Sequence, residues 1–183
     1  MKKVSLLGDS MRLIGYGLKV PALLADVAEV WQPDDNCRYS KYTLHGVQSP
    51  WAGGLAGSDV IHWNNGVWDG CDWGDGVFAP LDEYVTTMLR IAAVLQKQTK
   101  TVIFATTMPV AEGYLYSTNE RIAAYNEAIV PILREKGILI NDLHALVAPH
   151  IDTFIRTDDH IHLTEAGIDA CAAQVADMIR SAL

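Results

Sequence analysis

VSLLGDS, residues 4–10, places a short apolar run directly before a glycine, a carboxylate and a hydroxyl. A run of this kind, ended by small and polar residues, predicts a strand that stops at a tight turn. Strands that are buried on both faces read as nearly continuous apolar runs, which is typical of parallel sheets. TVIFA, residues 101–105, has the same character. Both stretches therefore favour an α/β fold with a parallel sheet.

The rest of the chain alternates between short apolar runs and longer amphipathic segments. The expected strands are Val4–Leu7, Val27–Trp31, Asp59–Trp63, Thr101–Thr106 and Ile138–Asn141. The expected helices are Leu13–Ala25, Ser40–Trp51, Leu81–Gln98, Asn119–Lys136 and Thr164–Ala182. Pro131 lies inside the fourth helix and should remove one of its hydrogen bonds. Strands that alternate with helices imply right-handed crossovers, so we expect a three-layer α/β/α sandwich around a five-stranded parallel sheet.

Composition and charge limit the classes of function. The 183 residues fit a single domain, residues 1–183, and half of them are apolar, which is typical of a globular protein. The formal net charge is −8 and the 14 basic residues are scattered, which argues against nucleic acid as a partner. No window reaches the roughly 18 apolar residues of a membrane span, so no membrane association is expected.

The N-terminal sequence and the cysteines indicate the expected cellular compartment. The apolar run after Lys2 and Lys3 is shorter than the core of a secretory signal. Cys37, Cys71 and Cys171 are odd in number and widely spaced, with no pair at metal-binding spacing. We therefore expect a cytoplasmic protein with reduced cysteines, without a bound metal and without an organic cofactor.

Ser10 is a candidate nucleophile only if a base can take its proton. By itself, the turn around Ser10 is also compatible with an N-cap, in which Asp9 or Ser10 accepts hydrogen bonds from the next helical turn. A candidate base lies near the other end of the chain, in RTDDHIHLTEAG, residues 156–167. Asp159 and His162 are three positions apart there, so the carboxylate can accept the imidazole Nδ1–H and leave Nε2 free.

Two other interpretations of this segment stay open. Asp158, four positions before His162, is a second candidate to orient the imidazole. His160 and His162 together suggest a metal, but they supply only two ligands and no further ligand cluster is evident. Because His160 lies two positions before His162, its side chain should point away from the candidate site.

These motifs, in this order, resemble the SGNH (GDSL-type) hydrolases. Residues 8–10, Gly-Asp-Ser, follow the first expected strand, an asparagine-containing turn follows the third, and Asp159-x-x-His162 lies near the C-terminus. The resemblance implies a flavodoxin-like α/β/α fold and esterase or acyl-hydrolase activity. It also implies that Ser10 is the nucleophile, His162 the general base and Asp159 the residue that orients the base. The Ser10 amide, at a helix N-terminus, would then be one oxyanion donor.

The second motif departs from the family pattern. The family has a glycine after the second strand, whose N–H helps to hold the oxyanion, whereas this chain has QPDDNCRYSKYTL, residues 32–44. We expect backbone N–H groups near Asn36, Cys37 and Arg38 to serve instead.

The third motif departs as well. The family pattern Gly-x-Asn-Asp is replaced by HWNNGVWD, residues 62–69. The side-chain oxyanion donor is therefore expected to be Asn64 or Asn65, since strand alternation turns only one of them toward the site. The expected substrate-binding residues are Asn36, Arg38 and Trp68.

Residues 51–76 hold four of the five tryptophans and seven of the 14 glycines. Two interpretations stay open: a functional loop system whose rings face a ligand, or rings that only cover a glycine-rich loop. Asp69, Asp72 and Asp75 lack the spacing of a calcium loop, so we expect a solvated acidic turn.

The expected function is a serine esterase that hydrolyses a small acyl ester through an acyl-enzyme, with acetyl as the first candidate acyl group. The expected partner is a small-molecule ester, for which an acetylated sugar is one candidate. Two alternatives stay open, a non-catalytic binding module on the same fold and an O-acyltransferase. A direct contact between Ser10 and His162 would favour catalysis, because a binding module has no need of an imidazole at that distance.

Overall fold

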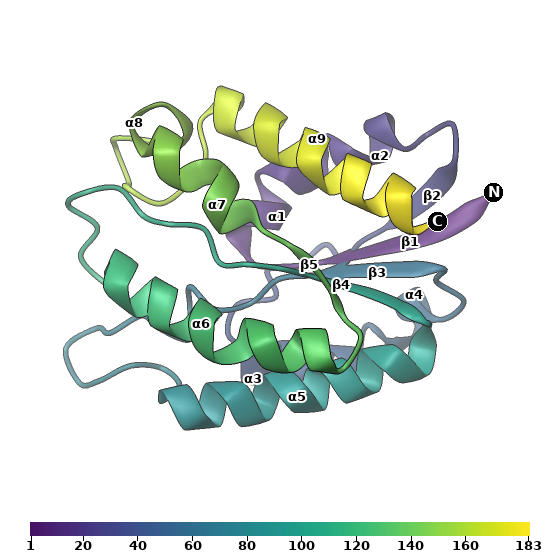
Figure 1. Ribbon diagram of the computed structural model, residues 1–183, viewed down its shortest axis with the longest axis horizontal. Helices are drawn as coiled ribbons and strands as arrows, with labels where there is room; N and C mark the ends of the chain where they lie inside the picture. The colour runs from purple at the N-terminus through teal and green to yellow at the C-terminus, as the bar shows by residue number, and fades with distance from the viewer.

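The computed structural model describes residues 1–183, which form a five-stranded parallel sheet with helices on both faces (Figure 1). The strands are β1 (Lys2–Leu7), β2 (Ala28–Trp31), β3 (Val60–Trp63), β4 (Thr101–Ala105) and β5 (Leu139–Asn141). Their order across the sheet is β2-β1-β3-β4-β5, and every neighbouring pair is parallel. The expected three-layer α/β/α sandwich is confirmed.

The helices form two layers, one above and one below the sheet in Figure 1. The upper layer contains α1 (Ser10–Leu13), η1 (Tyr16–Leu18), α2 (Val20–Leu23), α7 (Leu143–Val147), η2 (Ala148–His150), α8 (Ile151–Phe154) and α9 (Glu165–Ala182). The lower layer contains α3 (Ser40–Gln48), α4 (Ala52–Leu55), α5 (Leu81–Gln98) and α6 (Asn119–Glu135). None of these helices combines the length and the hydropathy that a membrane-spanning helix needs.

Each central strand sends alternate side chains into two separate cores. From β1, Leu6 joins the core between the sheet and α9, whereas Leu7 joins the core between the sheet and α5. β4 divides in the same way, with Ile103 on the α9 side and Phe104 on the α5 side. Both faces of these strands are therefore buried, which explains why their sequences are apolar almost without interruption.

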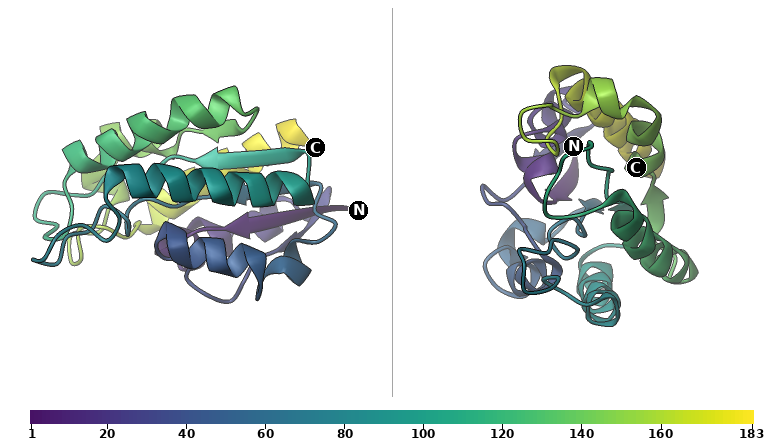
Figure 2. Two further views of the ribbon diagram at one scale, coloured as in Figure 1. Left: turned by 90° about the horizontal axis from the view of Figure 1, so that it is seen from below. Right: turned by 90° about the vertical axis from the view of Figure 1, so that its left-hand side faces the viewer.

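The loops that follow the strands gather at one end of the molecule. In the left panel of Figure 2 this end lies opposite the N- and C-termini, and the right panel is viewed from the loop end. Because all five strands are parallel, their carboxyl ends meet at this edge, where ligands bind in open α/β sheets.

The single helix expected over residues 13–25 is wrong, because the segment is divided into α1, η1 and α2. Gly15 separates α1 from η1, and a Cβ at this position would lie 2.2 Å from Met11 O. The chain therefore folds back too closely for any side chain. Pro21 lies in the first turn of α2, where its missing N–H is tolerated.

The helix expected over residues 119–136 is confirmed as α6, which contains Pro131 and ends at Glu135. The elements α7, η2 and α8 are absent from the sequence prediction. Each spans only three to five residues, which carry too little periodicity to be recognised.

Asp69 joins the loop after β3 to the start of α3. Its carboxylate accepts hydrogen bonds from Ser40 N at 2.9 and 3.1 Å and from Ser40 Oγ at 2.5 Å. The side chain is completely buried, so the expectation of a solvated acidic turn is wrong for this residue. Burial raises the pKa of Asp69 to about 6, against the opposite effect of the Ser40 hydrogen bonds.

Replacing Asp69 by Asn tests this buried charge. The folded pKa of about 6 lies above the ordinary value of 3.8, so the folded state binds more protons than the unfolded state between these values. Ionisation of Asp69 therefore lowers the free energy of unfolding as the pH rises from 3.8 to about 6, and the full destabilisation is present above pH 6. The unfolding free energy of Asp69→Asn minus that of the wild type should therefore be about 2 kcal/mol larger at about pH 8 than at about pH 4.5.

Urea unfolding of both proteins at the two pH values measures this gain. The comparison between variant and wild type removes the contributions of the other titrating groups, which the two proteins share. A free-energy difference that is the same at both pH values would contradict the raised pKa.

Candidate active site

Ser10 lies just beyond the carboxyl end of β1, as the first residue of α1. Asp9 caps this helical turn, because its carboxylate accepts a hydrogen bond from Met11 N at 2.9 Å. Gly8 leaves room for the turn, since a Cβ there would lie 2.8 Å from Arg12 Cβ. α1 has only four residues, so the amides of a single turn, rather than the dipole of a long helix, face this edge.

Hydrogen bonds join Ser10, His162 and Asp159. His162 Nε2 lies 2.9 Å from Ser10 Oγ, and His162 Nδ1 lies 3.0 Å from Asp159 Oδ2. The second carboxylate oxygen, Asp159 Oδ1, accepts from the backbone N–H groups of Ile161 at 3.1 Å and His162 at 2.9 Å. Because the carboxylate can only accept, Nδ1 carries the proton and Nε2 is left to accept from the Ser10 hydroxyl.

The surroundings of Asp159 keep it ionised. Burial by itself would raise the pKa of its carboxyl, but hydrogen bonds from the backbone of His162 and Ile161 and from the His162 ring lower it to about 2. Arg156 Nε adds a positive charge 3.6 Å from Asp159 Oδ2. Arg156 also binds Asp158, so Asp158 is engaged there and Asp159 is the carboxylate that orients His162.

Backbone contacts hold the turn that carries Asp159. Arg156 N donates to His162 O at 2.8 Å, and His160 N donates to Arg156 O at 3.1 Å. His160 has a φ of 63°, and its ring lies beside Gly113 and lines neither cavity that contains Ser10. No group of three or more His, Cys, Asp or Glu side chains is placed to hold a metal ion, so the pair His160 and His162 belongs to no such cluster.

Cys37 and Gly8 form a reciprocal pair. Cys37 N donates to Gly8 O at 3.1 Å, and Gly8 N donates to Cys37 Sγ at 3.3 Å. Burial raises the pKa of the Cys37 thiol to about 11, so it stays protonated. The Cys37 amide is therefore not free to hold an oxyanion, which corrects the role expected for it. It instead joins the loop after β2 to the turn that carries Ser10.

The amides of Asn64 and Asn65 are also engaged within the protein. Asn64 Nδ2 donates to Ala105 O at 3.1 Å, and Asn65 Nδ2 donates to Arg38 O at 2.8 Å. Both side chains are buried, and neither lines a cavity that contains Ser10. The geometry therefore does not offer either amide to a ligand at Ser10, because Asn64 binds the end of β4 and Asn65 binds the loop after β2.

Asn36 does line a cavity with Ser10. Its Oδ1 accepts from Arg38 N at 2.8 Å, which leaves Nδ2 as a donor without a protein acceptor. Ser10 N, in the first turn of α1, likewise has no acceptor in the protein. The Arg38 guanidinium lies 4.7 Å from the centre of the Tyr42 ring and does not line the Ser10 cavity, whereas Trp68 borders that cavity.

Arg12 is a residue of the site that sequence reasoning missed. It is fully buried, and its guanidinium donates to Gly8 O at 3.3 Å, to Pro33 O at 2.9 Å and to Asp35 O. Arg12 therefore fastens the loop after β2 to the turn that carries Ser10. Its one sequence signal is a lone arginine two positions after Ser10 in an otherwise apolar segment.

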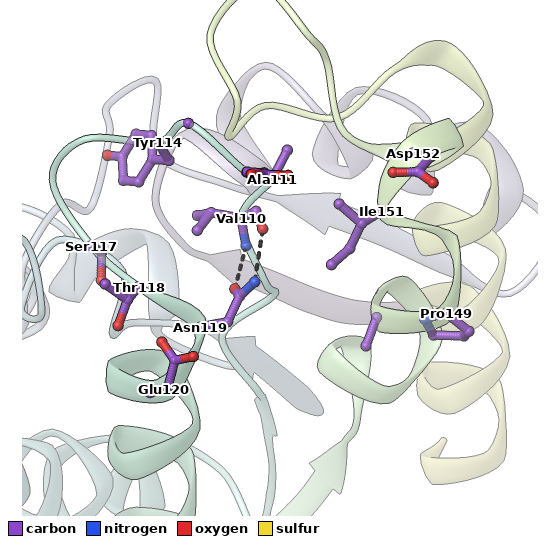
Figure 3. Close-up of a pocket in the computed structure, with 13 residues that line it drawn as sticks. Val110, Ala111, Tyr114, Ser117, Thr118, Asn119, Glu120, Pro149, Ile151 and Asp152 are labelled. Atoms are coloured by element: carbon purple, nitrogen blue, oxygen red, sulfur yellow. Dashed lines mark hydrogen bonds between the residues drawn. The ribbon is translucent and has the colours of Figure 1, made fainter.

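Ser10 and His162 lie between two cavities. One has a volume of about 410 Å³ and is bordered by α1 and the start of α9. The other has a volume of about 260 Å³ and is bordered by Trp68, Trp73 and Tyr114. A larger hollow of about 610 Å³ lies between the loop after β4 and the α8 region, and it contains neither Ser10 nor His162 (Figure 3). A ligand that reaches both Ser10 and His162 would therefore lie in one of the two smaller cavities.

Asp159→Asn should reverse the tautomer of His162. Asp159 Oδ1 accepts two backbone N–H groups, so the amide oxygen of asparagine must stay in that position. The asparagine NH₂ group then replaces Oδ2 and donates to Nδ1, which moves the imidazole proton to Nε2. NMR of the ring nitrogens should show Nδ1–H in the wild-type protein and Nε2–H in the variant.

Asp158→Asn is the matched control, because the exposed Asp158 binds Arg156 and not the imidazole. The His162 tautomer should not change in this control. A wild-type His162 that carries its proton on Nε2 would contradict the hydrogen-bond assignment.

Several solved hydrolases share this fold. Axe2, an acetylxylan esterase from Geobacillus stearothermophilus, has a TM-score of 0.81 and 18% sequence identity, over 97% of this chain and 94% of that chain. A lipase/acylhydrolase from Enterococcus faecalis has a TM-score of 0.80 and 17% identity, over 99% and 96%. LAE5, an α/β hydrolase from the metagenome of Lake Arreo in Spain, has a TM-score of 0.78 and 16% identity, over 100% and 96%. No protein-family model and no curated protein sequence matches the chain.

Three further Axe2 structures are catalytic mutants, in which a serine, an aspartate or a histidine is replaced by alanine. In Axe2 that aspartate and that histidine are three positions apart. At such low identities the similarity establishes the fold. The chain therefore has the same five-stranded α/β/α fold as these solved hydrolases.

Proposed function

We propose that the protein is a serine esterase that hydrolyses a small acyl ester through an acyl-enzyme on Ser10. Acetyl is the proposed acyl group and a carbohydrate the proposed alcohol part. The observation that carries the proposal is the 2.9 Å separation of Ser10 Oγ and His162 Nε2. A nucleophilic serine needs a base at this distance, whereas a binding module does not.

The comparisons support the same class of reaction. Axe2 is an acetylxylan esterase, and its catalytic mutants replace a serine, an aspartate and a histidine. In the present chain Asp159 and His162 have the same spacing as that aspartate and histidine, and they reach Ser10 through two hydrogen bonds. The structurally similar protein from Enterococcus faecalis is a lipase/acylhydrolase, so ester cleavage recurs on this fold.

In the proposed reaction, His162 Nε2 accepts the Ser10 proton while Oγ attacks the ester carbonyl carbon. The tetrahedral intermediate collapses, the bond to the alcohol oxygen breaks, and His162 returns the proton to that oxygen. Water then attacks the acyl-enzyme with His162 as its base, which releases the acid and restores Ser10. Asp159 stays ionised, because its pKa is about 2, and stabilises the imidazolium.

The proposed oxyanion donors are Ser10 N–H and Asn36 Nδ2. Ser10 and Asn36 line the same cavity, and neither the Ser10 N–H nor Asn36 Nδ2 has a hydrogen-bond acceptor in the protein. Donors that are fixed before the reaction stabilise the negative charge of the tetrahedral intermediate without reorganisation. Arg12 and Cys37 support this arrangement, because they hold the loop of Asn36 against the turn of Ser10.

A cytoplasmic location remains part of the proposal. Cys37, Cys71 and Cys171 are free and buried, as is usual in a reducing compartment. The proposed partner is a small-molecule ester, and the reaction requires no organic cofactor.

Ser10→Ala should eliminate both hydrolysis of p-nitrophenyl acetate and labelling by a fluorophosphonate probe, because the variant lacks the nucleophile. His162→Ala should lower kcat by about a thousandfold or more, because the hydroxyl loses its base. His160→Ala is the matched control and should retain turnover, since the His160 ring lies beside Gly113. Activity that survives Ser10→Ala, or a wild-type protein that neither labels nor cleaves esters, would overturn the proposal.

Asn36→Ala should lower kcat by about a hundredfold with a smaller change in KM, because an oxyanion donor acts mainly in the transition state. Steady-state kinetics with p-nitrophenyl acetate measure both constants. Asp34→Ala, an exposed change in the same loop, is the control and should leave kcat unchanged. An unchanged kcat in Asn36→Ala would remove Asn36 from the oxyanion site.

A further inference from the structure

A cavity of about 440 Å³ adjoins the aromatic side of the Ser10 cavity. The two cavities share Trp73 and Tyr114, so a molecule that extends from Ser10 on this side enters the second cavity. A volume of this size is within the roughly 300–1,000 Å³ of small-molecule sites. The second cavity takes no part in the proposed hydrolysis step, so its lining needs a separate explanation.

Aromatic rings form one wall of this second cavity. Trp73 and Tyr116 are stacked, with 5.0 Å between ring centres and 29° between ring planes. Tyr114 meets Tyr116 edge-on, with 5.7 Å between ring centres. Trp73 is 60% exposed and Tyr116 is 40% exposed, although both are large apolar side chains. Contiguous exposed apolar surface beside a cavity is typical of a binding site.

Polar groups of several kinds border the same cavity. The carboxylate of Asp72 and the guanidinium of Arg121 lie along the cavity, so it offers hydrogen-bond acceptors and donors together.

The loops that carry the rings are fixed to each other and to the helical layer. Asp72 N donates to Tyr116 O at 2.7 Å, which joins the loop after β3 to the loop after β4. Asp72 Oδ1 also accepts from two glycine amides that close the turn around Trp73. Figure 3 shows the base of the second loop, where Asn119 exchanges two hydrogen bonds with Val110. The backbone of the two loops that carry the rings is therefore tied together and joined to the start of α6.

This combination of groups selects a class of ligand. Flat ring faces suit the C–H face of a sugar ring, and mixed donors and acceptors suit its hydroxyl groups. An anionic lipid surface fits poorly, because the protein carries a formal net charge of −8. A neutral, polyhydroxylated ring therefore fits the cavity better than a charged or purely apolar ligand.

We propose that Trp73, Tyr114 and Tyr116 form a sugar-binding subsite for a neutral oligosaccharide that carries the ester cleaved at Ser10. One pyranose ring lies against the Trp73–Tyr116 pair, and its hydroxyl groups face Asp72 and Arg121. The subsite rests on the proposed function, because it assigns the alcohol part of the ester. It predicts that the protein prefers an acylated oligosaccharide to an ester of a small alcohol.

Tyr116→Ala tests the subsite through a ratio of two activities. The ratio divides kcat/KM for acetylated xylotetraose by kcat/KM for p-nitrophenyl acetate. It should fall about tenfold in Tyr116→Ala, because one stacking face is lost, and it should stay near the wild-type value in Tyr116→Phe, which keeps the ring. Leu18→Ala, an exposed apolar residue that lines neither cavity, is the surface control.

Calorimetric binding of unacetylated xylotetraose and cellotetraose supplies an independent readout. Millimolar binding to the wild-type protein that weakens in Tyr116→Ala supports the subsite, even if no ester is cleaved and the proposed function fails. Ser10-dependent hydrolysis of p-nitrophenyl acetate, with an unchanged ratio and no oligosaccharide binding, would overturn the subsite and leave the esterase standing. A change in oligomeric state without a change in the ratio would assign these rings to a second copy of the chain and also overturn the subsite.

Discussion

The contact between Ser10 Oγ and His162 Nε2 depends on burial that brings the two ends of the chain to one edge of the sheet. Met11, beside Ser10, and Leu163, beside His162, belong to the same core of 24 buried residues. A single hydrogen bond contributes only about 1 kcal/mol net, so it cannot by itself hold together segments that are so far apart in sequence. Burial of Met11 and Leu163 in this shared core therefore brings the two segments together, and the hydrogen bond follows from it.

The parts of this arrangement that follow local patterns could be predicted from the sequence. Apolar strands, amphipathic helices and the Asp159-x-x-His162 spacing each depend on residues a few positions apart. The oxyanion region could not be predicted, because it depends on which amides are already engaged. Cys37 N reaches Gly8 O across 29 positions, and Asn65 Nδ2 reaches Arg38 O across 27. No local signal shows that such donors are occupied, and the short helices around Gly15 are missed for a similar reason.

In the tryptophan-rich region, residues 51–76, one pair of rings is buried in the core and the other pair borders a cavity. Trp51 and Trp63 are almost completely buried in the core between the sheet and α5, so these rings stabilise the fold. Trp68 and Trp73 border the cavity of Ser10, and Trp73 is largely exposed. Sequence composition cannot separate the two pairs, because the difference lies in which side of the loop each ring faces. The glycines between them allow backbone conformations that place successive rings on opposite sides of the loop.

Buried charged groups collect around the same edge of the sheet. Burial raises the pKa values of Asp9 and Asp69 to about 6, so each carboxylate lowers stability at neutral pH. Apolar residues of similar volume are often more stabilising than buried charges. Yet Asp9 caps the turn of Ser10, Arg12 fastens the loop of Asn36, and Asp69 anchors the start of α3. Hydrogen bonds to charged groups fix loops in a direction that apolar contacts do not specify. Asp9 therefore lowers the stability of the fold at neutral pH and also caps the turn that places Ser10.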